Sequence, residues 1–156
     1  MKQSYIPFYV IALVVFISDQ VTKYLIQSHL RLFQVIPVLP FFNVVYVDNT
    51  GSAFGLFKGL GNPFFITVAA GAIIVIAVMI IKDRENRIGL SLILGGAAGN
   101  LADRIIRGYV IDFLDFYAGR HHWPAFNVAD SALTVGIALL AINLLFHKAG
   151  TGRPAG

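Results

Sequence analysis

Four stretches of the chain are apolar and long enough to cross a membrane as helices. They lie at about residues 5–26, 63–81, 88–106 and 125–146. A helix rises 1.5 Å per residue, so about 20 residues span the hydrocarbon core of a bilayer. The second stretch contains no charged residue, whereas the third is rich in glycine. The pattern predicts an all-α membrane protein with four transmembrane helices, built as a single domain over residues 1–156.

The segments between these stretches differ in length and character. Residues 82–87 form a short charged turn, 27–62 are long and mixed, and 108–124 are aromatic. Four crossings place both termini and the 82–87 turn on one side. Lys and Arg are denser in the short flanks of that side, which predicts that both termini are cytoplasmic. Residues 149–156 are expected to form a disordered tail.

The long connection contains a local pattern of its own. Residues 41–47 (FFNVVYV) are β-branched and aromatic, and Asn49, Thr50 and Gly51 indicate a turn. This pattern predicts a small extended or β element with an aromatic loop on the outer membrane face. The aromatics of this loop are Phe41, Phe42, Phe54 and Phe57.

Composition supports the membrane interpretation and excludes several other classes. Hydrophobic residues make up 57% of the 156 residues and charged residues 13%. So few charged side chains can hardly cover a soluble domain of this size, and disordered chains and coiled coils are more polar. There is no cysteine, which excludes disulfides, thiolate nucleophiles and Cys-ligated metals. The net charge of +4 comes without a basic patch interleaved with aromatics, so no nucleic-acid partner is expected.

Four carboxylates fall near one level at the outer ends of the predicted spans: Asp19, Asp103, Asp112 and Asp130. A carboxylate at the centre of a bilayer costs about 2.5–3.5 kcal/mol, so such groups usually face a bundle interior or a watery cavity. Asp112 and Asp130 flank a segment that can turn back on itself. Two carboxyls that meet there would share a proton, an arrangement that activates water and protonates a leaving amine.

Each of these acids also has a purely structural interpretation. Asp130 can cap the fourth helix, and Asp112 can be solvated at the interface. Local ion pairs account for the others, Asp103 with Arg104 and Asp19 with Lys23. The spacing of Gly95 and Gly99 favours close helix packing.

Two other functional classes are compatible with a small membrane protein that carries polar residues in its spans. Intramembrane acids also mark ion pathways, so a small proton- or cation-coupled transporter is the alternative function. The acids cluster at one end rather than at mid-span, which favours chemistry near the surface over conduction. A non-catalytic scaffold would leave that clustering without a reason.

Five ordered motifs carry a family resemblance. They are DQVTK at 19–23, NTGSAF at 49–54, GGAAGNLADR at 95–104, GYVIDF at 108–113 and FNVADS at 126–131. Together they resemble the lipoprotein signal peptidase family (bacterial signal peptidase II), whose members are intramembrane aspartic endopeptidases. The match covers nearly the whole chain.

The resemblance implies a catalytic dyad of Asp112 and Asp130. It implies removal of the signal peptide from diacylglyceryl-modified prolipoproteins by cleavage before the lipidated cysteine, with neither metal nor cofactor. The enzyme would sit in the bacterial cytoplasmic (inner) membrane, with its active site near the outer, periplasmic face. One chain contains a whole site, so a monomer is expected to suffice, with membrane lipid around it.

The same motifs supply residues expected to bind the substrate or to support the site. They are Asp19, Lys23, Asn49, Gly51, Phe54, Asn100, Asp103, Arg104, Asn127 and Ala129. The three asparagines are expected to position the substrate backbone. Arg104 would contact substrate carbonyls or hold the outer loop, and Asp103 would support Arg104 or neighbouring backbone.

Overall fold

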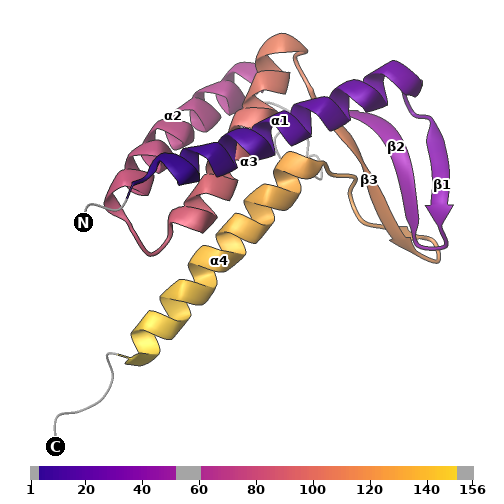
Figure 1. Ribbon diagram of the computed structural model, residues 1–156. Helices are drawn as coiled ribbons and strands as arrows, with labels where there is room; N and C mark the ends of the chain where they lie inside the picture. Colours follow the sequence, from indigo (N-terminus) through magenta and orange to yellow (C-terminus); the bar gives the residue numbers. More distant parts are fainter. Residues whose placement is uncertain (1–3, 52–60, 151–156) are drawn as a thin grey trace, which may run out of the picture.

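The structure, a computed structural model, describes residues 4–51 and 61–150. Its four helices are α1 (Ile6–His29), α2 (Gly61–Lys82), α3 (Arg87–Ile106) and α4 (Val128–Gly150). Its strands are β1 (Val35–Leu39), β2 (Phe42–Asn49), β3 (Val110–Ala118) and β4 (His121–His122). The helices form a bundle, and the strands form one antiparallel sheet beyond one end of it (Figure 1).

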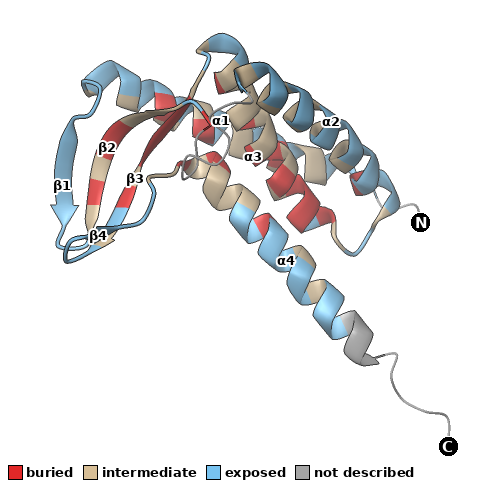
Figure 2. Cartoon of the chain, turned by 180° about the vertical axis from the view of Figure 1, so that it is seen from behind, coloured by how far each residue is buried: buried red, intermediate tan, exposed pale blue. Residues whose placement is uncertain are grey.

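Three of these helices combine the length and apolarity of a membrane span within the described residues: α1, α2 and the 128–146 part of α4. Helix α3 is more polar, with glycines along its middle. It packs against all three other helices and carries much of the buried surface (Figure 2). Because protein rather than lipid surrounds α3, its side chains need not be uniformly apolar.

The sheet corrects the sequence-based view in two places. The expected small β element is β1 and β2, but β3 lies within 108–124, which was expected to be a connection. "All-α" is therefore too narrow a description. The sequence of β3 does not show a clear alternation of apolar and polar positions, because residues on both of its faces are buried. Ile111 and Phe113 pack with Tyr46 on one side, whereas Asp112 faces the other. Helix α4 also begins at Val128, later than the expected start at residue 125.

Glycines in α3 allow unusually close helix packing. A Cβ added at Gly95 would lie 2.5 Å from the carbonyl oxygen of Ala12 in α1. A Cβ at Gly99 would lie 2.5 Å from Oδ2 of Asp19. The predicted packing role of these two glycines is confirmed, and at Gly99 the space is occupied by a carboxylate.

The burial pattern is that of a polar interior with an apolar exterior. Buried charged groups include Asp19, Lys23 and Asp103, while many large apolar side chains of α1, α2 and α4 are exposed. The start of α1, the α2–α3 turn and the far end of α4 lie away from the sheet (Figure 1). Helix α4 includes residues 149–150 of the expected tail. Residues 151–156, Phe54 and Phe57 lie outside the described residues.

Candidate active site

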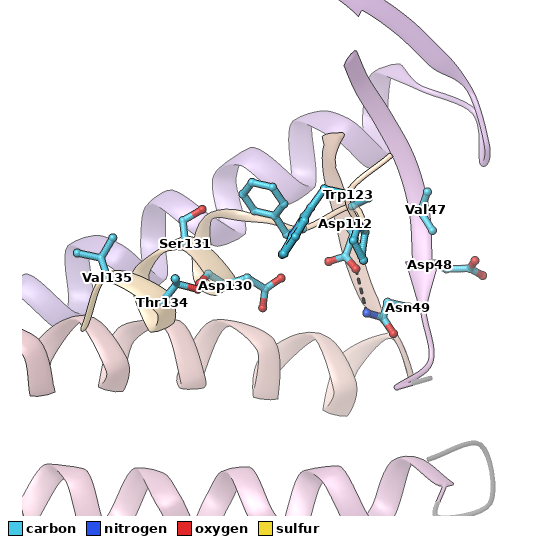
Figure 3. Close-up of a pocket in the computed structure, with 12 residues that line it drawn as sticks. Val47, Asp48, Asn49, Asp112, Trp123, Asp130, Ser131, Thr134 and Val135 are labelled. Carbon is cyan, nitrogen blue, oxygen red and sulfur yellow. Dashed lines mark hydrogen bonds between the residues drawn. The ribbon is translucent and has the colours of Figure 1, made fainter. Parts of the chain in front are cut away.

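A cleft of about 750 Å³ opens where the sheet meets the first turns of α4 (Figure 3). It is lined by Val47, Asp48, Asn49, Asp112, Trp123, Pro124, Ala125, Phe126, Asp130, Ser131, Thr134 and Val135. Asp112 and Asp130, which sequence analysis singled out, both lie in it. Figure 3 shows their carboxylates pointing into the space between them.

Asp112 is fixed by the pairing of β2 with β3. It lies opposite Val47, so Asn49, two residues further along β2, is on the same face of the sheet. The Nδ2 of Asn49 donates to Oδ2 of Asp112 at 3.0 Å, and the Oδ1 of Asn49 accepts from the backbone N–H of Gly51 at 2.9 Å. Gly51 has φ +100°, and a Cβ there would overlap the ring of Phe65. This turn therefore requires glycine.

Asp130 is fixed by the start of α4. The Oδ1 of Asn127 accepts from the backbone N–H of Asp130 at 2.9 Å, and Oδ2 of Asp130 accepts from the backbone N–H of Asn127 at 3.3 Å. These reciprocal bonds cap the helix. Oδ1 of Asp130 accepts from Nδ2 of Asn100 in α3 at 2.8 Å. Asp130 thus does take part in helix capping, as the structural interpretation held, while its other oxygen faces a second element.

Asn127 also connects the two acids. Its Nδ2 donates to Oδ1 of Asp112 at 2.8 Å. Burial raises the pKa of Asp112 to about 7, and the charge of Asp130 adds to the rise. The hydrogen bonds from Asn49 and Asn127 oppose it. Near neutral pH Asp112 is therefore partly protonated. Acid–base catalysis by two carboxyls requires a pair that holds one proton.

Behind the cleft lies a fully buried charge network. Lys23 Nζ lies 2.8 Å from Oδ2 of Asp19 and 2.8 Å from Oδ2 of Asp103. Oδ1 of Asp19 accepts from the backbone N–H of Ala129 at 2.9 Å, which ties α1 to the start of α4. Oδ2 of Asp103 accepts from the backbone N–H of Ile111 at 3.2 Å, which ties α3 to β3. The network positions the segments that carry Asp112 and Asp130.

Two expectations for α3 are resolved by these contacts. Asp103 supports neighbouring backbone, as expected, but the expected pairing with Arg104 is wrong. Its ion pairs are with Lys23 and with Arg107, one helical turn on, at 2.6 Å. The guanidinium of Arg104 instead lies over the ring of Phe65, with 4.6 Å from Cζ to the ring centre. Its Nη1 is buried and has no hydrogen-bond partner among the described residues.

Sequence analysis gave no role to two residues of the network. The Nε2 of Gln20 donates to Asp103 and to the carbonyl of Gly99, both at 3.1 Å. Arg107 neutralises Asp103. The i,i+4 spacing of Asp103 and Arg107 on one helix could have predicted this ion pair from the sequence. In the described part of the chain, no group of three or more His, Asp or Glu side chains could hold a metal ion.

Comparisons with known proteins identify the family of the chain. A sequence model of signal peptidase (SPase) II matches residues 11–146. The chain belongs to the signal peptidase II family. It is 50% identical over 125 residues to the lipoprotein signal peptidase of Thermodesulfovibrio yellowstonii, covering 80% of this chain and 85% of that protein. It is 46% identical over 152 residues to that of Geobacter metallireducens, covering 93% and 94%.

Solved structures match as well. A bacterial membrane enzyme structure at 2.3 Å superposes with a TM-score of 0.85 and 34% identity, covering 96% of this chain and 94% of that one. A second bacterial membrane enzyme, at 1.9 Å, gives a TM-score of 0.80 and 36% identity, covering 89% and 92%. This member of the signal peptidase II family is thus a membrane-bound, aspartic-type signal peptidase, and the transporter alternative is set aside.

Proposed function

We propose that the chain removes signal peptides from diacylglyceryl-modified prolipoproteins, cutting before the lipidated cysteine with Asp112 and Asp130 as the catalytic residues. The observation that carries this assignment is the pair itself. Two carboxyls from different elements face one cleft, and every oxygen of both accepts an N–H. Such preorganised acid–base pairs are typical of hydrolytic sites.

The chemistry follows the single proton that the pair holds. The ionised carboxyl takes a proton from water, and the water oxygen bonds to the scissile carbonyl carbon. The protonated carboxyl meanwhile gives its proton to the carbonyl oxygen, so that a neutral gem-diol forms. The gem-diol collapses as its carbon–nitrogen bond breaks. The leaving nitrogen takes a proton from the protonated carboxyl, and one gem-diol hydroxyl returns a proton to the ionised carboxyl, so the pair again holds one proton. The resulting acid and amine account for all atoms of the water.

The membrane placement extends this proposal. All four helices span the bacterial inner membrane as one domain, with the termini cytoplasmic and the cleft at the outer face. Three apolar helices and the location of the sheet at one end of the bundle support this arrangement. The acyl chains of the substrate stay in lipid beside the helices. Both acids and their amide donors come from one chain, so a monomer suffices.

The remaining site residues have roles in the same proposal. The three asparagine amides are used by the acids, so we assign them to dyad positioning ahead of the substrate-backbone role expected from sequence. Arg104, whose Nη1 has no hydrogen-bond partner among the described residues, is available to a substrate carbonyl. Gly51 holds the turn beside Asn49, and Phe54 belongs to the aromatic loop proposed to clamp the substrate.

The test is cleavage by purified protein in detergent or lipid. A prolipoprotein carrying diacylglyceryl on its lipobox cysteine is compared with the same polypeptide without the modification. Mass spectrometry should find one cut, directly before the cysteine, in the modified substrate only. Equal cleavage of both would refute the substrate assignment. No cleavage of several modified substrates by folded protein would refute the proposed function.

A further inference from the structure

Lys23 is fully buried, and each of its three N–H donors has a partner. Two go to the carboxylates of Asp19 and Asp103, and the third goes to Oδ1 of Asn100 at 3.0 Å. Arg107 shares the charge of Asp103. Two carboxylates and two cations balance within this network, so charge balance alone does not require the contact with Asn100. That contact connects the network to Asp130, which lines the cleft, because Asn100 donates to Asp130.

The contact fixes the direction of the Asn100 amide. An ammonium group only donates, so the oxygen of Asn100 must face Lys23. Nδ2 of Asn127 faces the same oxygen at 3.3 Å. The Asn100 NH₂ is thereby turned toward Oδ1 of Asp130, to which it donates at 2.8 Å. A flipped amide would place its NH₂ against the ammonium and its oxygen against a carboxylate.

The two acids receive different donors. Asp130 receives the Lys23-oriented amide and a backbone N–H, and it lies in the first turn of α4, where a helix end favours an anion. Asp112 lies within a strand and receives two neutral amides. One of them, from Asn127, is shared with the carbonyl of Ile111 at 3.2 Å. Negative charge is therefore better accommodated on Asp130 than on Asp112.

The charged groups that act on the pair come from α1, α3 and α4. Lys23 of α1 acts on both acids, and Asp19 of α1 acts on Asp130. Arg104 of α3 interacts with both acids, and Asp130 of α4 acts on Asp112. Lys23 lowers the pKa of Asp112 against the effect of burial. Removing Lys23 should therefore be visible in the pH dependence of the pair.

We infer that Lys23 is a positioning residue that acts through Asn100 and makes Asp130 the ionised base, leaving the proton of the resting pair on Asp112. This assignment rests on the proposed dyad chemistry and deepens it, since sequence and chemistry alone leave the two acids interchangeable.

The test begins with Lys23→Met, measured by steady-state cleavage of the diacylglyceryl-modified substrate across pH. The kcat is expected to fall roughly tenfold to a hundredfold, the range for one hydrogen bond to a charged group, with KM nearly unchanged. The acidic limb of the kcat/KM profile should move to higher pH by roughly one pH unit, because a cation near the pair is lost.

Lys23→Met also removes the cation that pairs with the buried carboxylates of Asp19 and Asp103, which can destabilise the fold. A charge-balanced variant therefore separates the effect on dyad positioning from the effect on folding. In Lys23→Met/Asp19→Asn, the new side chain keeps an oxygen for the N–H of Ala129, and Asp103 keeps Arg107. This variant should regain thermal stability but retain the low kcat, while the loss of the Asp19 anion offsets part of the pH displacement. Wild-type kcat in the double variant would overturn the inference.

A third variant keeps the ion pairs of Lys23 and removes the Asn100 amide that connects Lys23 to Asp130. Asn100→Leu leaves Lys23 its two carboxylates and should reproduce the kcat loss. It should displace the acidic limb in the same direction, because ionised Asp130 loses the hydrogen bond from Asn100. Combining it with Lys23→Met should cost no further activity, because both act on one path. Additive losses would overturn the inference. Failure of wild type to cleave is a separate result, which would refute the proposed function itself.

Discussion

Asp112→Asn should change how the stability of the protein depends on pH. The carboxyl has an ordinary pKa of 3.8, and in the folded protein burial and the charge of Asp130 raise the pKa of Asp112 to about 7. The folded state therefore binds this proton more tightly than the unfolded state. The contribution of Asp112 is neutral below pH 3.8, becomes increasingly destabilising up to about pH 7, and stays constant above it.

The size of this pH-dependent change in the free energy of unfolding follows from the interval between the ordinary and the raised pKa of Asp112. Each pH unit within this interval costs about 1.4 kcal/mol, so the cost grows by about 3 kcal/mol between pH 5 and pH 8. The substitution removes this dependence. It also places an NH₂ against the NH₂ of Asn49 or Asn127, which costs about 1–3 kcal/mol at every pH. Only the change with pH therefore isolates the titration of Asp112.

The assay is equilibrium unfolding in a fixed detergent micelle, followed by far-ultraviolet circular dichroism at pH 5, 6, 7 and 8. The free energy of unfolding of the variant minus that of wild type should rise by about 3 kcal/mol over this range, and most of the rise should fall below pH 7. A constant difference would refute the reasoning, because it would mean that the fold does not hold the proton on Asp112.

Two glycine substitutions test the packing around the site, each against Gly71→Ala, since a Cβ at Gly71 meets nothing within 4 Å. Gly99→Ala places a Cβ 2.5 Å from Oδ2 of Asp19 and should lower the free energy of unfolding by about 1–3 kcal/mol. Melting at the temperature of the control would contradict this packing. Gly51→Ala combines a strained φ of +100° with overlap of Phe65. It should lower kcat/KM by roughly tenfold or more through displacement of Asn49, which donates to Asp112. Unchanged kinetics would show that the turn does not hold Asn49.

The helices could be predicted from sequence because apolar runs of about 20 residues admit few other structures. The sheet could be predicted only in part. The 41–47 pattern indicated β structure. Strand β3 did not, because each of its faces mixes apolar residues with an aspartate, Asp112 on one face and Asp115 on the other. Polar residues inserted for function obscure the periodicity from which strands are recognised.

The dyad candidates could be singled out because carboxylates at the ends of membrane spans are costly. Their partners were harder to assign. Asp103 was expected beside Arg104, its neighbour in sequence, but helix geometry turns adjacent residues apart and favours Arg107. The contact of Lys23 with Asn100 joins positions 77 residues apart, which no local pattern specifies.

The central claim is that Asp112 and Asp130 together carry out the cleavage. The most direct measurement compares kcat for the diacylglyceryl-modified substrate in wild type, Asp112→Asn and Asp130→Asn, with folding checked by circular dichroism. Asp83→Asn, in the α2–α3 turn away from the sheet, is the matched control. Both dyad variants should lose roughly a hundredfold to ten-thousandfold or more, and the control should match wild type. Activity within tenfold of wild type in either folded dyad variant would contradict the claim.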